Sequence, residues 1–170
     1  MKREKSIWYY HQNPDRWQPE YPECSFFEHL RLGAVHYPDL VAVEFQGRKY
    51  TYKQLISNVE MVATALIAAG VKKGDCVSVV TPNIPQALFM IYAINRIGAI
   101  ANMIHPLLSV NEIQAFVENT DSVAILTLDM IYPKFAKIKW KTSKEPKMIL
   151  EGCRKAGRRH FRHRGTDRCQ

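Results

Sequence analysis

The stretch of residues 76–104 constrains the fold of this chain more than any other. An apolar run at 76–80 leads through a Thr-Pro-Asn turn into a nearly all-apolar segment at 84–97, which Gly98 ends before a second apolar run at 99–104. Strand, helix and strand with tight connections form the unit from which parallel sheets are built. A helix that is apolar on nearly all sides is buried. The sequence therefore predicts a helix packed between layers of a larger structure.

A membrane-spanning helix is the alternative interpretation of the same stretch. Its uninterrupted apolar run covers only residues 87–94, whereas a span needs about 20 residues. Extension to residue 104 brings in Arg96, which costs about 2.5–3.5 kcal/mol near the centre of a bilayer. The sequence favours the buried helix and predicts no membrane span.

Helix start signals and short β-rich runs flank this central unit. Boxes of the Ser/Thr-x-x-Glu/Gln type begin at Ser25, Thr51 and Ser109, and each box supplies two reciprocal hydrogen bonds to a helix N-terminus. The three helices are expected to end near Tyr37, at Gly70 and near Asn119, and further strands are expected at 40–45, 48–50 and 122–126.

Strands that alternate with helices predict the fold class. The expected order is helix, hairpin, helix, strand, helix, strand, helix, strand. Such alternation is typical of an α/β layered domain with a mainly parallel sheet and flanking helices.

Composition divides the chain into three segments. Residues 1–24 form an arm rich in aromatic residues and proline, which we expect to lie extended over the body, with its rings on apolar surface. Residues 25–150 carry the α/β pattern. Residues 151–170 are basic and poor in large apolar side chains, so we predict disorder there.

The net charge of +8 is not spread evenly. Residues 1–138 hold 13 of the 24 Lys and Arg and 13 of the 16 Asp and Glu, so the whole excess lies in residues 139–170. The body therefore gives no electrostatic reason to expect nucleic acid as a specific partner. The N-terminus has no apolar core typical of a signal peptide, so we expect a cytoplasmic protein with reduced thiols.

Few residues suggest chemistry directly. Residues 152–159 resemble a phosphate loop but lack its Lys-Ser/Thr pair and a preceding strand. His105 follows a predicted strand, where open α/β sheets bind ligands, but a turn histidine bonded to backbone is favoured. Asn83 is interpreted as the cap of the central helix. Zinc ligation is conceivable at four residues whose spacing fits no usual finger: Cys153, His160, His163 and Cys169.

Five motifs in order resemble the adenylate-forming, AMP-dependent synthetase and ligase superfamily. The run at 50–55 (YTYKQL) is similar to its TYxEL motif, and 70–77 to its GvkkGDrV turn and strand. Residues 81–83 resemble its xPN turn, 97–106 its xGAvxvpxnP motif, and 109–112 the start of its next helix. The match covers roughly residues 20–138 and extends as far as 150.

The resemblance implies an N-terminal fragment of an AMP-forming acyl-CoA synthetase. Such enzymes use ATP, Mg²⁺ and CoA to convert a carboxylic acid into acyl-CoA, AMP and pyrophosphate. The motifs here resemble most those of enzymes that act on fatty acids. The family's phosphate loop, ribose-binding aspartate and C-terminal lysine are absent from this sequence. The resemblance therefore assigns no catalytic, cofactor-binding or metal-binding residue, and we expect no bound cofactor and no activity of the chain alone.

Other functions and origins stay open at this point. A non-catalytic protein that binds or complements a partner would reuse the same fold piece, and the basic tail would support nucleic-acid binding. The sudden change near residue 150 also suggests a frameshift, which reading the coding DNA in all frames would test. An incomplete domain leaves apolar surface uncovered, so self-association and poor solubility are expected.

Overall fold

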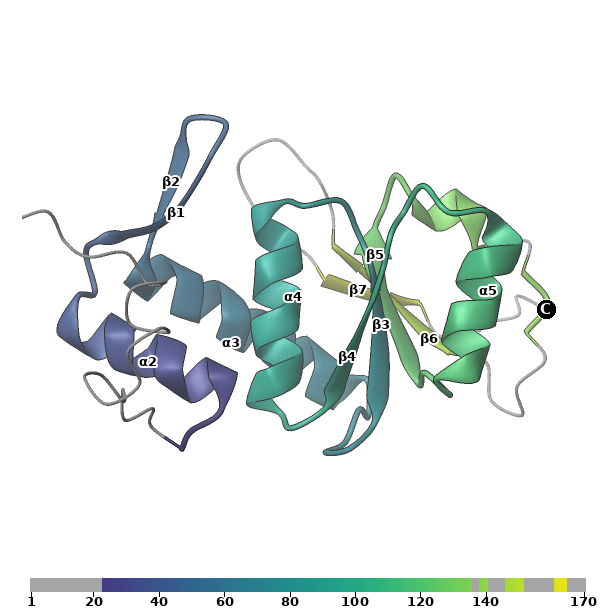
Figure 1. Cartoon of the computed structure of the whole chain (residues 1–170), viewed down its shortest axis with the longest axis horizontal. Helices are drawn as coiled ribbons and strands as arrows, with labels where there is room; N and C mark the ends of the chain where they lie inside the picture. The colour runs from purple at the N-terminus through teal and green to yellow at the C-terminus, as the bar shows by residue number, and fades with distance from the viewer. Residues whose placement is uncertain (1–22, 136–137, 141–145, 152–160, 165–170) are drawn as a thin grey trace, which may run out of the picture.

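A computed structural model describes residues 23–135, 138–140, 146–151 and 161–164 (Figure 1). The expected N-terminal arm lies outside the described residues, except for its last two positions. The strands are β1 (Val41–Phe45), β2 (Arg48–Thr51), β3 (Cys76–Val80), β4 (Ile100–Ile104), β5 (Ala124–Leu128), β6 (Lys147–Glu151) and β7 (Phe161–Arg164). The helices are α2 (Phe26–His36), α3 (Tyr52–Ala68), α4 (Pro85–Arg96), α5 (Val110–Asn119) and a 3₁₀ turn, η2 (Tyr132–Lys134).

The larger sheet has the strand order β4-β3-β5-β6-β7. The first four of these strands run parallel to one another, and β7 pairs antiparallel with β6. Strands β1 and β2 form a separate antiparallel hairpin. The prediction of an α/β domain with a mainly parallel sheet and flanking helices is confirmed.

The sheet separates two hydrophobic clusters. On one face, Val77 and Val79 of β3 pack in a cluster with buried residues of α2, α3 and α4. On the other face, Val80 packs in a cluster with Ile113 and Val117 of α5. Figure 1 shows α5 on the opposite side of the sheet from α3 and α4. The described part of the chain is therefore a three-layer α/β/α structure.

Helix α4 occupies the buried position that its composition predicts. Every residue of α4 except Arg96 is buried or half-buried. The helix packs against α2 and α3 on one side and against β3 and β4 on the other. Among the described residues, no helix is long and apolar enough to cross a membrane.

Glycines end α3 and α4 as the sequence predicts. Gly70 follows the C-cap residue of α3 with φ +83°, and Gly98 follows that of α4 with φ +73°. Only glycine adopts these left-handed angles without steric cost. The Lys147 ammonium at the start of β6 donates a hydrogen bond to the Ala69 carbonyl, so the end of α3 is tied to the sheet by a charge of the favourable sign.

Two of the three predicted capping boxes are complete. Thr51 with Gln54, and Ser109 with Glu112, each exchange both expected hydrogen bonds. At α2, Ser25 Oγ accepts from the Glu28 amide at 3.1 Å, but the Glu28 carboxylate binds Arg31 instead of the Ser25 amide. The charged partner one turn away offers Glu28 a stronger hydrogen bond than a neutral amide does.

The capping box of α5 gives a prediction about pH. Hydrogen bonds from the side chain and the backbone amide of Ser109 hold the pKa of the Glu112 carboxyl below its usual range. Because the folded-state pKa is depressed, this contribution to stability is present above the unfolded-state pKa and is lost as pH falls through the folded-state pKa. We expect Ser109→Ala to raise the Glu112 pKa in an NMR titration of side-chain carboxyl carbons.

The control for this titration is Ser57→Ala, which changes an exposed serine on α3. It should leave the Glu112 midpoint unchanged. An equal midpoint in Ser109→Ala and in the unsubstituted chain would show that the box does not set the pKa.

Two predictions of local structure are wrong. The strand expected at 122–126 begins at Ala124 and ends at Leu128, because the Ser122 amide donates to the Val117 carbonyl at the end of α5, at 3.1 Å, instead of to the ladder. Asn83 is not the cap of α4: the N-cap is Ile84, which makes no side-chain cap hydrogen bond, and Pro85 follows it in the first turn. Proline at the first helical position has no N–H that needs a partner, and the Ala87 amide donates to the Ile84 carbonyl at 3.0 Å.

The C-terminal segment differs from the prediction of disorder at one place. Residues 161–164 form β7, whose backbone pairs antiparallel with β6. Met148 lies opposite Arg164 at one end of the pairing, and Glu151 lies opposite Phe161 at the other. The prediction of disorder rested on the scarcity of large apolar side chains, but backbone pairing to a sheet edge does not depend on such side chains. The rest of 151–170, apart from Glu151, lies outside the described residues.

Candidate functional site: an apolar groove at the sheet edge

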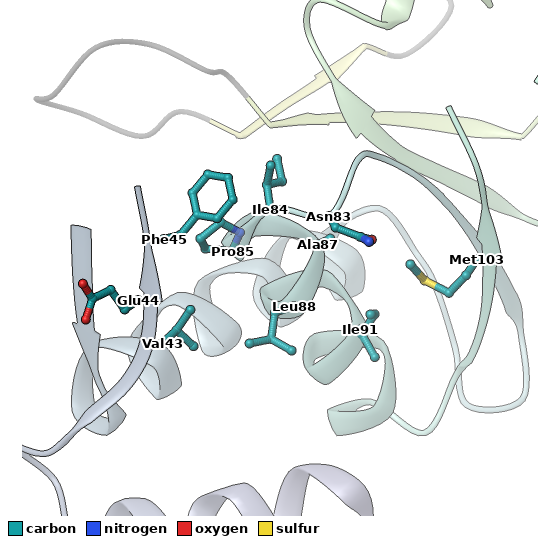
Figure 2. Close-up of a pocket in the computed structure, with 10 residues that line it drawn as sticks. All are labelled: Val43, Glu44, Phe45, Asn83, Ile84, Pro85, Ala87, Leu88, Ile91 and Met103. Carbon is teal, nitrogen blue, oxygen red and sulfur yellow. The ribbon is translucent and has the colours of Figure 1, made fainter. Parts of the chain in front are cut away.

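An open apolar groove of ≈ 270 Å³ lies between the hairpin and the edge of the larger sheet. Helix α4 forms its floor, with β1 on one side and β4 on the other (Figure 2). The lining residues are 43–45 of β1, 83–85 of the turn before α4, Ala87, Leu88 and Ile91 of α4, and Met103 of β4.

The groove owes its position to the parallel sheet. The turn at 81–84 follows the carboxyl end of β3, and Met103 lies next to the carboxyl end of β4. Open α/β sheets bind ligands outside the carboxyl ends of their strands. Among the surfaces of the described chain, the groove is therefore the first candidate for a binding site.

Polar groups in the groove are few. Glu44 and Asn83 are its strongly polar lining residues, and Glu44 forms an exposed ion pair with Lys49 across the hairpin, at 3.7 Å. Among the described residues that line the groove there is no lysine or arginine. The groove therefore suits an apolar or aromatic occupant and offers no cation for a phosphate.

A buried polar network lies on the other face of the sheet. The Ser78 and Ser122 hydroxyls are 2.7 Å apart, and Asn102 Nδ2 donates to Ser78 Oγ at 3.0 Å and to Thr120 Oγ1 at 3.1 Å. Ser122 also donates to Cys76 Sγ at 3.5 Å. These bonds join β3 and β4 to the end of α5 and satisfy one another, so the network is structural.

His105 is placed as the sequence analysis favoured. Its side chain is exposed just after β4, and its Nδ1 accepts a hydrogen bond from the Leu107 amide at 3.3 Å. This is the geometry of a turn histidine bonded to backbone. It is not a lining residue of the groove.

The conceivable metal ligands are not brought together by any described contact. Cys153, His160 and Cys169 lie outside the described residues, as does the phosphate-loop resemblance at 152–159. His163 is placed as part of the β7 backbone. Within the described ranges, no group of three His, Cys, Asp or Glu side chains could hold a metal ion.

The groove itself was not predicted from the sequence. Its walls come from residues 43–45 and Met103, which only the tertiary fold brings together around α4. The available signal was the apolar residues along β1 and the apolar positions Leu88 and Ile91 of α4. That signal does not distinguish a groove from a packed core.

Comparison with known proteins identifies the family. The strand order and the layers define an α/β protein with a mainly parallel sheet. The model of the AMP-binding enzyme family matches residues 30–163. The chain belongs to this family, and the match continues past residue 150, the expected end of the resemblance.

Curated relatives agree with the family. The chain is 32% identical over 110 residues to a long-chain-fatty-acid–CoA ligase of Bacillus subtilis, covering 65% of this chain and 20% of the relative. It is 39% identical over 85 residues to acetyl-coenzyme A synthetase 1 of Saccharomyces cerevisiae, covering 49% of this chain and 12% of the relative. The chain thus spans about a fifth or less of these relatives.

Solved structures show the same fold. A long-chain-fatty-acid–CoA ligase (FadD1) from Archaeoglobus fulgidus superposes with a TM-score of 0.71 at 20% identity, covering 78% of this chain and 28% of that one. The N-terminal domain of FACL13 from Mycobacterium tuberculosis gives 0.66 at 24% identity, covering 76% and 34%. The described residues therefore share the fold of these two structures.

Proposed function

We propose that this chain supplies framework strands and helices of an acid–thiol ligase that joins a carboxylic acid to CoA with the cleavage of ATP to AMP and pyrophosphate. The match of the AMP-binding family to residues 30–163 carries this proposal. The names of the relatives, a long-chain-fatty-acid–CoA ligase and an acetyl-coenzyme A synthetase, share ligation to CoA. We therefore assign the class of reaction, with a carboxylic acid as substrate.

The groove does not fit ATP, Mg²⁺ or the phosphates of CoA. Adenylation requires cations and backbone donors around the phosphates. The polar side chains that line the groove are an acid, Glu44, and an amide, Asn83, and the N-terminus of α4 carries a proline in its first turn. A carboxylate at the rim repels a phosphate. We propose that the chain alone neither binds these cofactors nor catalyses adenylation.

This proposal predicts the outcome of an ATP–pyrophosphate exchange assay. With acetate, an intermediate-length acid and a long-chain fatty acid as substrates, the purified chain should exchange labelled pyrophosphate no faster than a reaction without protein. The full-length Bacillus subtilis relative serves as the positive control. Exchange that depends on any one acid and grows with the concentration of the chain would overturn the claim of inactivity.

The limits of the segments stay predictions. We propose an arm at 1–24, a body at 25–150 and a basic tail at 151–170, although the family match runs to residue 163 and β7 lies within the tail. Limited proteolysis with mass spectrometry of the fragments would test both boundaries. A resistant core that extends beyond residue 150 would move the second boundary.

A further inference from the structure

The larger sheet has two outer edges among the described strands, β4 at one end and β7 at the other. β7 reads FRHR and therefore carries two arginines, and charged residues on an edge strand discourage pairing with another chain. β4 reads IANMI and contains no charge and no proline. Within the described part of the chain, β4 is therefore the edge that lacks the usual protection.

The hydrogen bonds to β3 show which backbone groups of β4 point outward. The Ile100 amide donates to the Asp75 carbonyl at 2.8 Å, and β4 pairs with β3 in parallel register along its whole length. The N–H and C=O groups of successive strand residues point to alternate sides. Because the groups of Ile100 point toward β3, those of Ala101 and Met103 point to the open side of the sheet.

The side chains of β4 divide between the two faces of the sheet. Ile104 belongs to the cluster with α5, whereas Ala101 packs against the cluster that includes α4. Met103 is 49% exposed and lines the groove together with Leu88 and Ile91 of α4 (Figure 2). The two residues with outward backbone groups thus carry their side chains on the α4 face, next to the apolar groove.

The open edge of β4 is complementary to a second copy of itself. When two such strands run antiparallel about a twofold axis at Asn102, Ala101 of one copy lies opposite Met103 of the other. Opposite residues whose backbone groups face each other in an antiparallel pair exchange both N–H···O=C bonds, and the axis repeats this exchange. The outward groups of both residues are then satisfied in both copies, while the hydrogen bonds to β3 stay intact.

Charge also favours a second copy at this edge. Residues 1–138 have no net charge, with 13 Lys and Arg against 13 Asp and Glu, so two copies that approach through β4 do not repel each other there. The basic strand β7 lies at the other end of the strand order, so pairing through β4 keeps the two β7 strands at the far ends of the joined sheet. Pairing through β7 would instead bring like charges together, which is unfavourable.

We propose that this chain forms a dimer in which β4 pairs antiparallel with β4 of a second copy, with the twofold axis at Asn102. The described strands of both copies then form one continuous sheet. Because the axis is perpendicular to the sheet, the grooves of both copies lie on the same side of it, and Met103 of each copy is covered at the junction. The dimer does not depend on the proposed ligase function, since only the edge of the sheet takes part.

Light scattering combined with residue-resolved amide exchange of the full chain tests this pairing. We expect the mass of a dimer and slow exchange of the Ala101 and Met103 amides, which should lose their protection when dilution separates the copies. The Asn102 amide faces β3 and should exchange at the same rate in both states. A chain that is monomeric at every concentration would overturn the proposal. A dimer in which the two outward amides exchange freely would overturn it as well, because its contact would lie elsewhere.

Charge variants at Met103 test whether this residue meets its own copy. Met103→Lys and Met103→Glu each place like charges on the two sides of the axis, where long side chains of a diagonal pair reach each other. Each variant should weaken dimerisation by about tenfold or more. A mixture of the two variants in equal amounts should form dimers again, because opposite charges then face each other across the axis.

The matched control changes Met130, which is 72% exposed and follows β5, away from the open edge. Met130→Lys and Met130→Glu should each dimerise as the unsubstituted chain does, alone and mixed. Unchanged exchange at residues 124–128 would show that every variant keeps the sheet folded. Full dimerisation of Met103→Lys or Met103→Glu alone, or no recovery in their mixture, would overturn the twofold pairing.

Discussion

Replacing Phe89 with alanine is expected to lower the free energy of unfolding by about 3–5 kcal/mol. Phe89 lies in the middle of α4 with 0% of its surface exposed, and its ring packs edge to face on Tyr50 of β2, with centroids 5.6 Å apart. Removing the ring loses apolar burial and leaves a cavity between the hairpin and the sheet. Because single domains are stable by only about 5–15 kcal/mol, the loss is a large fraction of the total.

Urea denaturation followed by circular dichroism measures this loss. The matched control is Phe116→Ala on α5, where the same ring is 50% exposed, and it should change stability by about 0.5 kcal/mol or less. If Phe89→Ala cost no more than Phe116→Ala, α4 would not be the central packing element that both the sequence and the structure indicate.

Local signals predicted the elements of this fold well. The boxes at Thr51 and Ser109 were confirmed because all their partners lie within one helical turn. Gly70 and Gly98 end their helices because a left-handed residue is needed there whatever packs around it. The parallel sheet followed from the strand–helix–strand order.

Predictions failed where distant residues decide the outcome. The start of β5 depends on Ser122, whose amide donates to Val117 of α5 and whose hydroxyl is bonded to Ser78 of β3. The start of α4 is an exception, because Pro85 is a local signal for the first helical position and was overlooked. β7 depends on an available edge of β6. Composition and spacing carry no information on such partners.

The candidate site shows the same division. The resemblance to the adenylate-forming superfamily came from short motifs, and the family match confirmed it. The groove escaped prediction because β1, α4 and β4 contribute to it together. The motifs specify the turns that position these elements. The groove depends on the distances between β1, α4 and β4, which no local pattern encodes.

Replacing Ile113 with alanine is expected to lower the free energy of unfolding by about 2–5 kcal/mol. Ile113 is 0% exposed and anchors α5 in the second cluster, on the opposite face of the sheet from Phe89. Its loss should loosen α5 first, because α5 then keeps a single buried side chain, Val117. The control is Ile67→Ala on α3, at a position 61% exposed, which should be nearly neutral.

The two clusters also predict how these sites combine. Phe89→Leu and Ile113→Val are mild enough to combine in one chain, and their effects should add within about 0.3–0.5 kcal/mol because the sheet lies between the two side chains. Urea denaturation of the two single variants and the double variant measures the coupling. A coupling energy above about 1 kcal/mol would mean that the sheet transmits packing changes from one face to the other, and that the two clusters act as one core.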